Sequence, residues 1–431
     1  MERIQPVLLR VLAVTLSLYT ISTLTTMAGM EIFGWTSATL VLVLLVFFRK
    51  TLPLKRPLLT ILDYWLLPLC FVIILGAFFA ESADADKIAI IGRARFVILF
   101  LLLRIGLEVV PKRYFKTVLT VMLGLVALIG IYAIFQRFTG IDLIRGPGRV
   151  AVQPYPGGIT YRAQGPFNHP VRFAHTFVMS LCFPFAVVLM GDRFSKRVFG
   201  LALFALAVGS VGLIWSYTRG AWFSLAASFF VMALYYRMRA LKTLAIVAAI
   251  GLAAVVFSSG VILHRAESVT DMKYESNALR LNIWKANIQM FKDHPLMGVG
   301  YGINEDLNRE YFDKMGIKQE FTGHAHNNYL QFLSGTGLPG FLLFIGFSLS
   351  GLWIAHKGFR AHRADRDAWV PMILLAALGA QIAMQVGGLT ETNFKNAETN
   401  HHFMLIVAVM LMLTRLPDPL AGSLEPLGDA T

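Results

Sequence analysis

The segment GHAHNNYLQFLSGTGLPG, residues 323–340, marks the point where a long polar stretch of the chain becomes apolar. His326 stands at this junction, and Leu330 and Leu333 follow it at helical spacing. The hydrocarbon core of a bilayer tolerates ionisable groups only at sites or pathways, so we expect His326 to face water or a cavity at the membrane surface. The glycines and proline of residues 335–340 break the helix, and irregular backbone at membrane depth must be covered by protein or line a wet cavity.

A histidine at the start of a membrane helix has two interpretations. The unpaired N–H groups and partial positive charge of a helix N-terminus disfavour imidazolium, which keeps the ring of His326 neutral. A neutral imidazole at a wet surface can serve as a general base. The alternative is that His326 merely caps the helix. The rest of the chain favours the first interpretation.

The composition is that of a membrane protein with many spans. Hydrophobic residues make up 56% of the 431 residues, charged residues make up 15%, and the mean hydropathy is +0.62. The net charge of +14 does not by itself indicate nucleic-acid binding, because membrane proteins concentrate Lys and Arg on one side. Cys70 and Cys182 lie in apolar runs and suggest neither metal binding nor a disulfide.

Apolar stretches of bilayer length predict an all-α integral membrane protein with about twelve transmembrane helices. The first apolar run lacks a convincing signal-peptide cleavage site, so it is taken as the first span. Alternate loops rich in Lys and Arg place both termini in the cytoplasm. These basic loops are residues 49–56, 112–116, 193–197, 237–242 and 357–366. The predicted spans are residues 7–28, 32–48, 58–80, 94–110, 115–137, 171–191, 197–217, 220–238, 241–262, 327–355, 369–390 and 398–415.

The predicted spans divide the chain into four parts. Residues 1–262 hold the first nine spans, with an outer loop at about 138–170. Residues 263–326 form a large, partly helical outer loop, and residues 327–416 hold the last three spans. Residues 417–431, which are small and proline-rich, are predicted to be a disordered cytoplasmic tail.

The large outer loop contains one clear helical pattern. Leu281, Trp284, Ile288 and Phe291 recur at steps of three and four and predict an amphipathic helix. Its boundary residues are predicted to be Ser276 or Asn277, as the N-cap, and His294-Pro295, as the stop.

Arginines gather at the predicted helix starts on the outer face. Thr218 is placed to cap the helix that Arg219 begins, and Arg280 falls in the first turn of the loop helix. A cation opposes the helix dipole there, so these positions predict an anionic partner, and guanidinium groups suit phosphate oxygens. For any single arginine, snorkelling or pairing with a nearby acid is the alternative. Arg162 and Arg265 complete the set.

The remaining candidate groups are assigned lesser roles. His324 is not one helical turn from His326, so we expect it to face elsewhere. The outer loops show no close carboxylate pair of the kind that holds a divalent ion on a diphosphate, which predicts neither a metal nor a cofactor. Arg104, inside an apolar run, is expected to pair within the bundle. Supporting positions near the outer surface are predicted for His169, His401 and His402.

Four short motifs follow one another on the predicted outer face. They are Arg162-Ala-Gln-Gly-Pro-Phe with Asn168-His169-Pro170; Thr218-Arg219-Gly220-Ala221; Arg280 with Trp284, leading to Pro295-Leu296-Met297-Gly298-Val299-Gly300; and His326-Asn327-Asn328-Tyr329-Leu330, leading to Gly337-Leu338-Pro339-Gly340. In this order they resemble the O-antigen ligase family of bacterial inner-membrane glycosyltransferases, which is related to the O-antigen polymerases. The first five spans carry no matching motif.

The resemblance implies a GT-C-like fold and an inverting glycosyltransferase. It implies transfer of O-antigen glycan from undecaprenyl diphosphate to lipid A–core oligosaccharide on the periplasmic face of the inner membrane, with membrane lipids but no nucleic acid as partners. His326 would be the base, with Arg219 and Arg280 in the catalytic set. The predicted substrate-binding residues are Arg162, Arg265, Asn168, Asn327 and Tyr329.

Three alternatives remain open from the sequence. An O-antigen polymerase, or a relative that glycosylates proteins, would use the same chemistry with another acceptor. A transporter or flippase of lipid-linked glycan would also need outward-facing arginines. Transporters, however, tend to show matching broken helices in two related halves, and this chain has one clear break, at residues 335–340.

Overall fold

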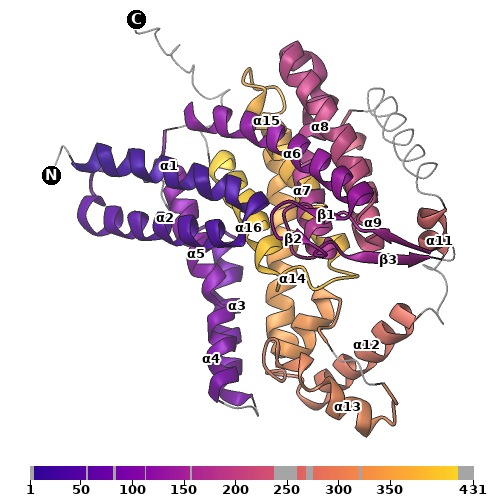
Figure 1. The fold of residues 1–431 in the computed structure, drawn as a ribbon. Coiled ribbons are helices and arrows are strands. Elements are labelled where there is room, and N and C mark those ends of the chain that lie inside the picture. Colours follow the sequence, from indigo (N-terminus) through magenta and orange to yellow (C-terminus); the bar gives the residue numbers. More distant parts are fainter. Residues whose placement is uncertain are drawn as a thin grey trace, which may run out of the picture.

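The structure, a computed structural model, describes residues 4–54, 57–80, 84–111, 113–155, 158–236, 260–267, 275–319 and 323–415. It consists of helices and two short antiparallel hairpins (Figure 1). The helices are α1 (Ile4–Thr25), α2 (Met27–Phe48), α3 (Asp63–Phe79), α4 (Asp84–Arg93), α5 (Arg95–Val109), α6 (Arg113–Thr139), α7 (Pro170–Met190), η1 (Gly191–Arg193), α8 (Lys196–Ile214), α9 (Arg219–Leu234), α11 (Val261–Glu267), α12 (Glu275–Asp293), η2 (Ile303–Glu305), α13 (Asn308–Lys314), α14 (Asn328–His362), α15 (Trp369–Gly387) and α16 (Ala397–Thr414). The strands are β1 (Ile141–Asp142), β2 (Gly146–Pro147), β3 (Val152–Tyr155) and β4 (Gly158–Tyr161).

The helices have the character of an all-α, multi-pass membrane protein, as predicted. Eight of those described are long and apolar enough to cross a membrane, namely α1, α2, α6, α7, α8, α14, α15 and α16. The predicted third and eighth spans correspond to the shorter apolar helices α3 and α9, and the predicted fourth span corresponds to α5. The predicted ninth span, residues 241–262, lies mostly outside the described residues.

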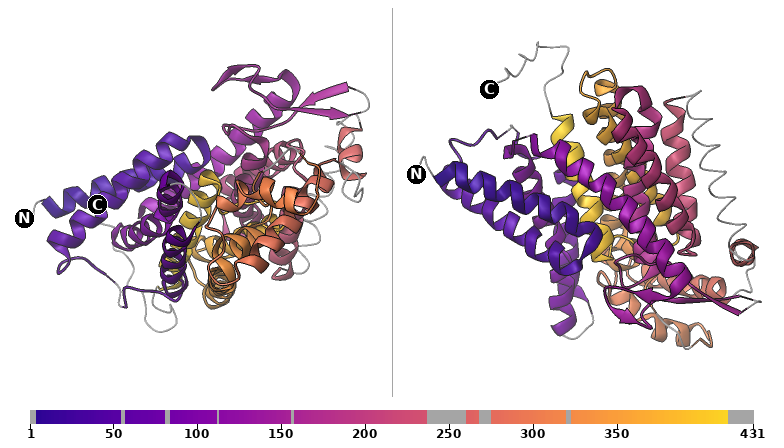
Figure 2. Two further views of the ribbon diagram at one scale, coloured as in Figure 1. Left: turned by 90° about the horizontal axis from the view of Figure 1, so that it is seen from below. Right: turned by 45° about the horizontal axis from the view of Figure 1, so that its top comes forward.

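The bundle is built around α7. Almost every side chain of α7 is buried, and the helix packs against α8, α9, α15 and α16. Helices α1 and α2 run side by side at the edge of the bundle, steeply inclined to α14 (Figure 1). The two hairpins gather with α12 and α13 at one end of the bundle, the lower end in the right view of Figure 2. The polar chain segments are thus concentrated where several long helices begin.

Arg104 pairs inside the bundle, as expected. Its side chain is 1% exposed and lies 3.0 Å from Asp63 and 3.3 Å from Glu108. Arg415, just after α16, also binds Glu108, at 2.8 Å. Buried charges persist only when they are paired, so this network ties α3, α5 and the end of α16 together.

The predicted amphipathic helix is present as α12 and ends at Asp293, directly before His294-Pro295. Its start was predicted wrongly. The helix begins at Glu275, so Ser276 and Asn277 lie inside it and neither is its cap. Arg280 consequently lies in the second turn rather than the first.

The predicted apolar face of α12 was also misplaced. The buried side chains are Ile283, Ala286 and Met290, which pack with Phe312 of α13, whereas Ile288 is 41% exposed. This helix carries two overlapping sets of apolar residues, and the members of each set are three or four residues apart. The position of α13 decides which of them is buried.

Helix α14 is interrupted at Gly337, where the backbone takes φ 66° and ψ −170°. Pro339 has no N–H, so the carbonyl of Gly335 lacks its helical partner. The N–H of Gly300 supplies the missing donor at 3.1 Å. Backbone from another part of the chain therefore replaces the lost helical bond.

Two more backbone hydrogen bonds join the broken part of α14 to the same segment of the chain. The N–H of Val299 donates to the carbonyl of Ser334 at 2.9 Å, and the N–H of Leu338 donates to the carbonyl of Pro295 at 2.8 Å. Residues 295–300 thus lie along the break and pair with its backbone. The expectation that protein or water must cover the broken backbone is met by protein.

This contact predicts that Gly298→Ala will destabilise the protein by about 3 kcal/mol or more. Gly298 has φ +64°, and a Cβ there would lie 2.5 Å from the backbone of Gly335 and the carbonyl oxygen of Ser334. Gly316→Ala is the matched control, since Gly316 has φ +67° but open space around it, and should cost only about 1 kcal/mol. Unfolding midpoints in detergent measure both, and equal losses would show that the close backbone contact contributes nothing.

Candidate active site

The candidate site lies where α7, α9, α14 and α16 begin. The N–H of Asn328 donates to the carbonyl of Gly388 at 2.7 Å, which joins the start of α14 to the α15–α16 loop, residues 388–396. Gly220, in the first turn of α9, lies so close to Thr390 of this loop that no side chain would fit there. Helix N-termini carry partial positive charge and unpaired N–H groups, so several starting together favour a bound anion.

One carboxylate holds two histidines at this position. His326 Nδ1 lies 3.1 Å from one oxygen of Glu391, and His324 Nε2 lies 3.3 Å from the other. The two imidazole centroids are 4.0 Å apart. We call His324, His326 and Glu391 the histidine–glutamate cluster. The prediction that His324 faces elsewhere is wrong, because His326 has a left-handed backbone, φ +46°, so helical spacing does not apply to this turn.

The charge of Glu391 fixes the tautomer of His326. Burial raises the pKa of this carboxyl, but the hydrogen bond and positive charge of His326, with the charge of His324, hold it below its ordinary value. An ionised carboxylate can only accept hydrogen bonds, so Nδ1 of His326 must donate. Nε2 of His326 then carries a lone pair, and in the described part of the chain no group bonds to it.

His324 uses both of its ring nitrogens within the protein. Nε2 donates to Glu391, while Nδ1 accepts from the backbone N–H of His326 at 3.2 Å and from the Thr392 hydroxyl at 3.1 Å. Burial lowers the pKa of His324, Glu391 opposes this shift, and His326 adds to it. His324 therefore positions the carboxylate and has no nitrogen left for a substrate.

Asn327, and not His326, caps α14. Its side-chain oxygen accepts from the N–H groups of Tyr329 at 2.9 Å and Leu330 at 3.1 Å. The interpretation of His326 as a simple helix cap is therefore wrong. The hydroxyl of Tyr329 donates to Gln385 of α15 at 3.2 Å. Asn327 and Tyr329 thus hold the frame of the site, and their contact with substrate stays a prediction.

Arg162 and Arg219 meet at the turn before α9. Arg162 donates to the Ser216 carbonyl at 2.8 Å and to the Thr218 hydroxyl at 3.2 Å. Thr218 occupies the N-cap position, but its hydroxyl makes no capping bond, so that prediction is wrong in detail. Arg219 is 9% exposed and donates to the side chain of Asn277 at 2.8 Å.

Helix α12 brings Arg280 to the same place. Asn277, the partner of Arg219, lies one turn before Arg280, which is close enough to His175 of α7 to interact with it electrostatically. Trp284, one further turn along, donates its indole N–H to the carbonyl of Ala325 at 2.8 Å, in the loop that carries His326. These contacts join Arg162, Arg219 and Arg280 to the elements that surround the histidine–glutamate cluster.

Two predicted binding residues lie at the margin of the described site. Asn168 is exposed just before α7, and His169 caps that helix by accepting from the N–H of Val171 at 3.2 Å. Burial and the charge of Arg162 lower the pKa of His169. The backbone of Arg265 belongs to α11, and its side chain lies outside the described part of the structure.

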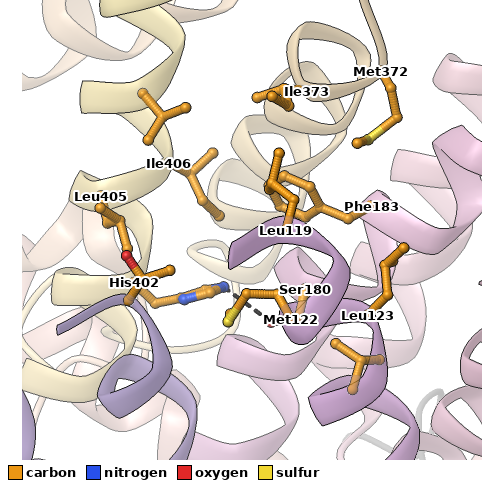
Figure 3. A pocket seen from close by; sticks show the side chains of 13 residues that line it. Leu119, Met122, Leu123, Ser180, Phe183, Met372, Ile373, His402, Leu405 and Ile406 are labelled. Carbon is orange, nitrogen blue, oxygen red and sulfur yellow. Dashed lines mark hydrogen bonds between the residues drawn. The ribbon is translucent and has the colours of Figure 1, made fainter. Parts of the chain in front are cut away.

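His401 and His402 are buried rather than interfacial, although their place in the second turn of α16 keeps them near the end of the bundle that holds the site. They are 6% and 2% exposed because they fall in α16 where it packs against α1 and α7. His402 bonds the hydroxyls of Ser180 and Thr23, each at 2.9 Å, and lines an apolar cavity of about 60 Å³ (Figure 3). His401 bonds Tyr19 at 3.3 Å. Neither is placed to replace His326 as a base.

Glu391 is the functional residue that sequence reasoning missed. Its signal was an acidic residue among polar neighbours, Thr390-Glu391-Thr392-Asn393, in the short loop between two apolar spans. Ligand atoms of His324, His326 and Glu391 all lie within 4.8 Å of one another, so these residues could hold a metal ion. The search for carboxylate pairs overlooked this set, and metal independence stays a prediction.

The depressed pKa predicts how Glu391→Gln alters acid stability. Below the ordinary glutamate value of 4.5, the unfolded chain binds a proton that the folded chain does not, so stability from Glu391 is complete above this pH and is lost as the pH falls. Unfolding midpoints between pH 6 and about pH 3.5 should therefore fall less steeply in Glu391→Gln than in the native protein. Glu310→Gln, an exposed residue paired with Lys314, should keep the native slope, and a shared slope in all three would contradict the argument.

A family model described as O-antigen ligase matches residues 201–345. The matched region contains Arg219, Arg280 and His326, while Arg162 and Glu391 lie outside it. A comparison with curated proteins gives no match. The resemblance predicted from the sequence motifs is confirmed over the matched residues, and it supports a membrane glycosyltransferase of the O-antigen ligase and polymerase kind.

Proposed function

We propose that this chain, with the O-antigen ligase family match at residues 201–345, transfers O-antigen glycan from undecaprenyl diphosphate to lipid A–core oligosaccharide on the periplasmic face of the inner membrane. One observation carries the proposal. An ionised Glu391 holds Nδ1 of His326 and leaves Nε2 with a free lone pair on a partly exposed ring, 21% accessible, among arginines. This is the arrangement of an oriented general base beside an anion-binding surface.

The reaction is a single displacement at the anomeric carbon of the donor sugar. An acceptor hydroxyl gives its proton to Nε2 of His326 while its oxygen bonds to the anomeric carbon. The bond from that carbon to the diphosphate oxygen breaks, and undecaprenyl diphosphate leaves with the electron pair. Attack from the opposite face inverts the configuration. Glu391 stabilises the imidazolium until the proton passes to solvent.

The arginines serve the leaving group in this proposal. Arg219, Arg280 and Arg162 are proposed to face the diphosphate, where their positive charge and the helix N-termini would oppose the negative charge that develops, and the contacts of Arg219 with Asn277 and of Arg162 with Thr218 support this. Fixed donors aimed at developing charge stabilise a transition state without reorganisation. Arg265 is proposed as a further contact to the donor. The arginines would supply what a divalent ion supplies in many diphosphate-using transferases.

An assay with purified protein and defined acceptors tests the proposed transfer. The protein receives lipid-linked O-antigen together with either lipid A–core or a second portion of lipid-linked O-antigen. Glycan on lipid A–core identifies a ligase, and elongated lipid-linked glycan identifies a polymerase. Intact donor moved across proteoliposomes with no new glycosidic bond would identify a transporter and overturn the proposal.

We expect His326→Ala to lower transfer by about a hundredfold or more, because the base is lost. His324→Ala should cause a smaller loss, because His324 only positions Glu391. Initial rates at equal membrane levels of both variants measure the difference. Similar rates for His326→Ala and the native protein would remove the base assignment.

Transfer by the purified protein should survive EDTA if arginines stabilise the diphosphate. The comparison is informative because the histidine–glutamate cluster could bind a metal ion. Activity that disappears with chelator and returns with zinc, magnesium or manganese would assign the cluster to a metal instead. Rates are measured after dialysis against EDTA, with dialysis alone as the control.

A further inference from the structure

Another cavity, distinct from the one beside His402, opens next to the start of α7. It has a volume of about 270 Å³ and lies between the α1–α2 turn, the β1–β2 hairpin and the residues that precede α7. Its lining combines hydroxyl and amide groups with apolar side chains, whereas the cavity beside His402 is almost wholly apolar (Figure 3). The polar lining includes Ser22, Thr25, Thr26, Asn168, Arg145 and Glu398.

Glu398 gives the lining of this cavity a negative charge that Arg172 partly offsets. The residue is 5% exposed, and one carboxylate oxygen accepts from Arg172 at 3.2 Å. The other oxygen is buried and has no hydrogen-bond partner among the described residues. That oxygen is shielded from the cavity, so Glu398 contributes negative charge to the lining rather than a hydrogen-bond site for a ligand.

The charges around the cavity favour a neutral ligand over an anion. Arg145 is engaged by Asp142, at 2.5 Å, and by the carbonyl of Pro166, while Arg172 is engaged by Glu398. An anion would meet the negative charge of Glu398, and like charges repel. Hydroxyl groups of a neutral ligand can exchange hydrogen bonds with the threonines and the asparagine of the lining.

We infer that this cavity is a subsite for one sugar ring of a saccharide substrate, an inference that rests on the proposed glycosyl transfer. The volume is slightly below the roughly 300–1,000 Å³ of sites for drug-sized ligands, which suits a single ring. Phe167 adds an aromatic face to the lining, against which the C–H groups of a sugar can pack.

The position of the cavity fits a sugar next to the reacting one. Asn168 lines the cavity, and the adjacent His169 is close enough to His326 and Glu391 to interact with both electrostatically. The first turn of α7 therefore separates the subsite from the histidine–glutamate cluster. The sugar could come from the donor glycan or from the acceptor oligosaccharide, and kinetics can distinguish these two sources.

The kinetic test uses Thr26→Val and Glu398→Gln with donor and acceptor varied separately. Loss of a hydroxyl contact in Thr26→Val, or of the charge that holds Arg172 in Glu398→Gln, should raise the KM for one substrate about two- to tenfold with little change in kcat. The substrate whose KM rises is the source of the sugar. Thr36→Val is the matched control, because its exposed hydroxyl on α2 bonds only the Ile32 carbonyl. Unchanged KM values for both substrates in both variants would overturn the subsite.

A direct binding test separates the subsite from the proposed reaction. Saturation-transfer NMR on the full chain carrying His326→Ala reports binding of core oligosaccharide and of O-antigen polysaccharide, each freed from lipid by mild acid. We expect signal from one of them, reduced when Thr26→Val is added and not displaced by inorganic phosphate. Binding here, together with no transfer by the native protein in the assay with defined acceptors, would leave the subsite standing and the proposed function refuted. Absence of binding, or displacement by phosphate, would overturn the subsite.

Discussion

The backbone pairing between residues 295–300 and the broken part of α14 is the contact on which the rest of the site depends. A glycine with positive φ and a proline cannot continue a helix, and they leave carbonyl groups that the membrane interior would not satisfy. Val299 and Gly300 supply those partners. The same pairing fixes the end of α12 against α14, so Trp284 can reach the carbonyl of Ala325. The position of Arg280 relative to His326 follows from this anchoring.

The turn that carries His326 depends on its neighbours in the same way. A left-handed backbone at a residue other than glycine costs about 1–3 kcal/mol and persists only where its surroundings enforce it. Asn327 caps α14, Asn328 bonds the α15–α16 loop, and Ala325 bonds Gln331 at 3.1 Å. With the backbone fixed on both sides, both imidazoles turn toward Glu391. Preorganisation of this kind allows a hydrogen bond to select one tautomer.

The sequence predicted the helices better than it predicted which residues contact one another. Apolar length identified the long apolar helices, and the arginines at helix starts on one face predicted that Arg219 and Arg280 lie near His326, which stays a prediction. Glu391 could not be found this way, because its contact with His326 joins segments that no local pattern connects. The cap predictions failed for a related reason. Thr218 and Asn277 have the correct side chains for caps, but arginines from elsewhere use their oxygens instead.

The proposed transfer requires two opposite electrostatic conditions in the site. Stabilising a leaving diphosphate requires arginines and helix N-termini, and that positive field opposes the formation of an imidazolium when the base accepts its proton. A buried carboxylate in direct contact with the imidazole offsets this field locally. His324 and Thr392 complete the arrangement by holding the carboxylate in place. In the proposed transfer, the cluster would allow a histidine to act as a base beside groups that bind a diphosphate.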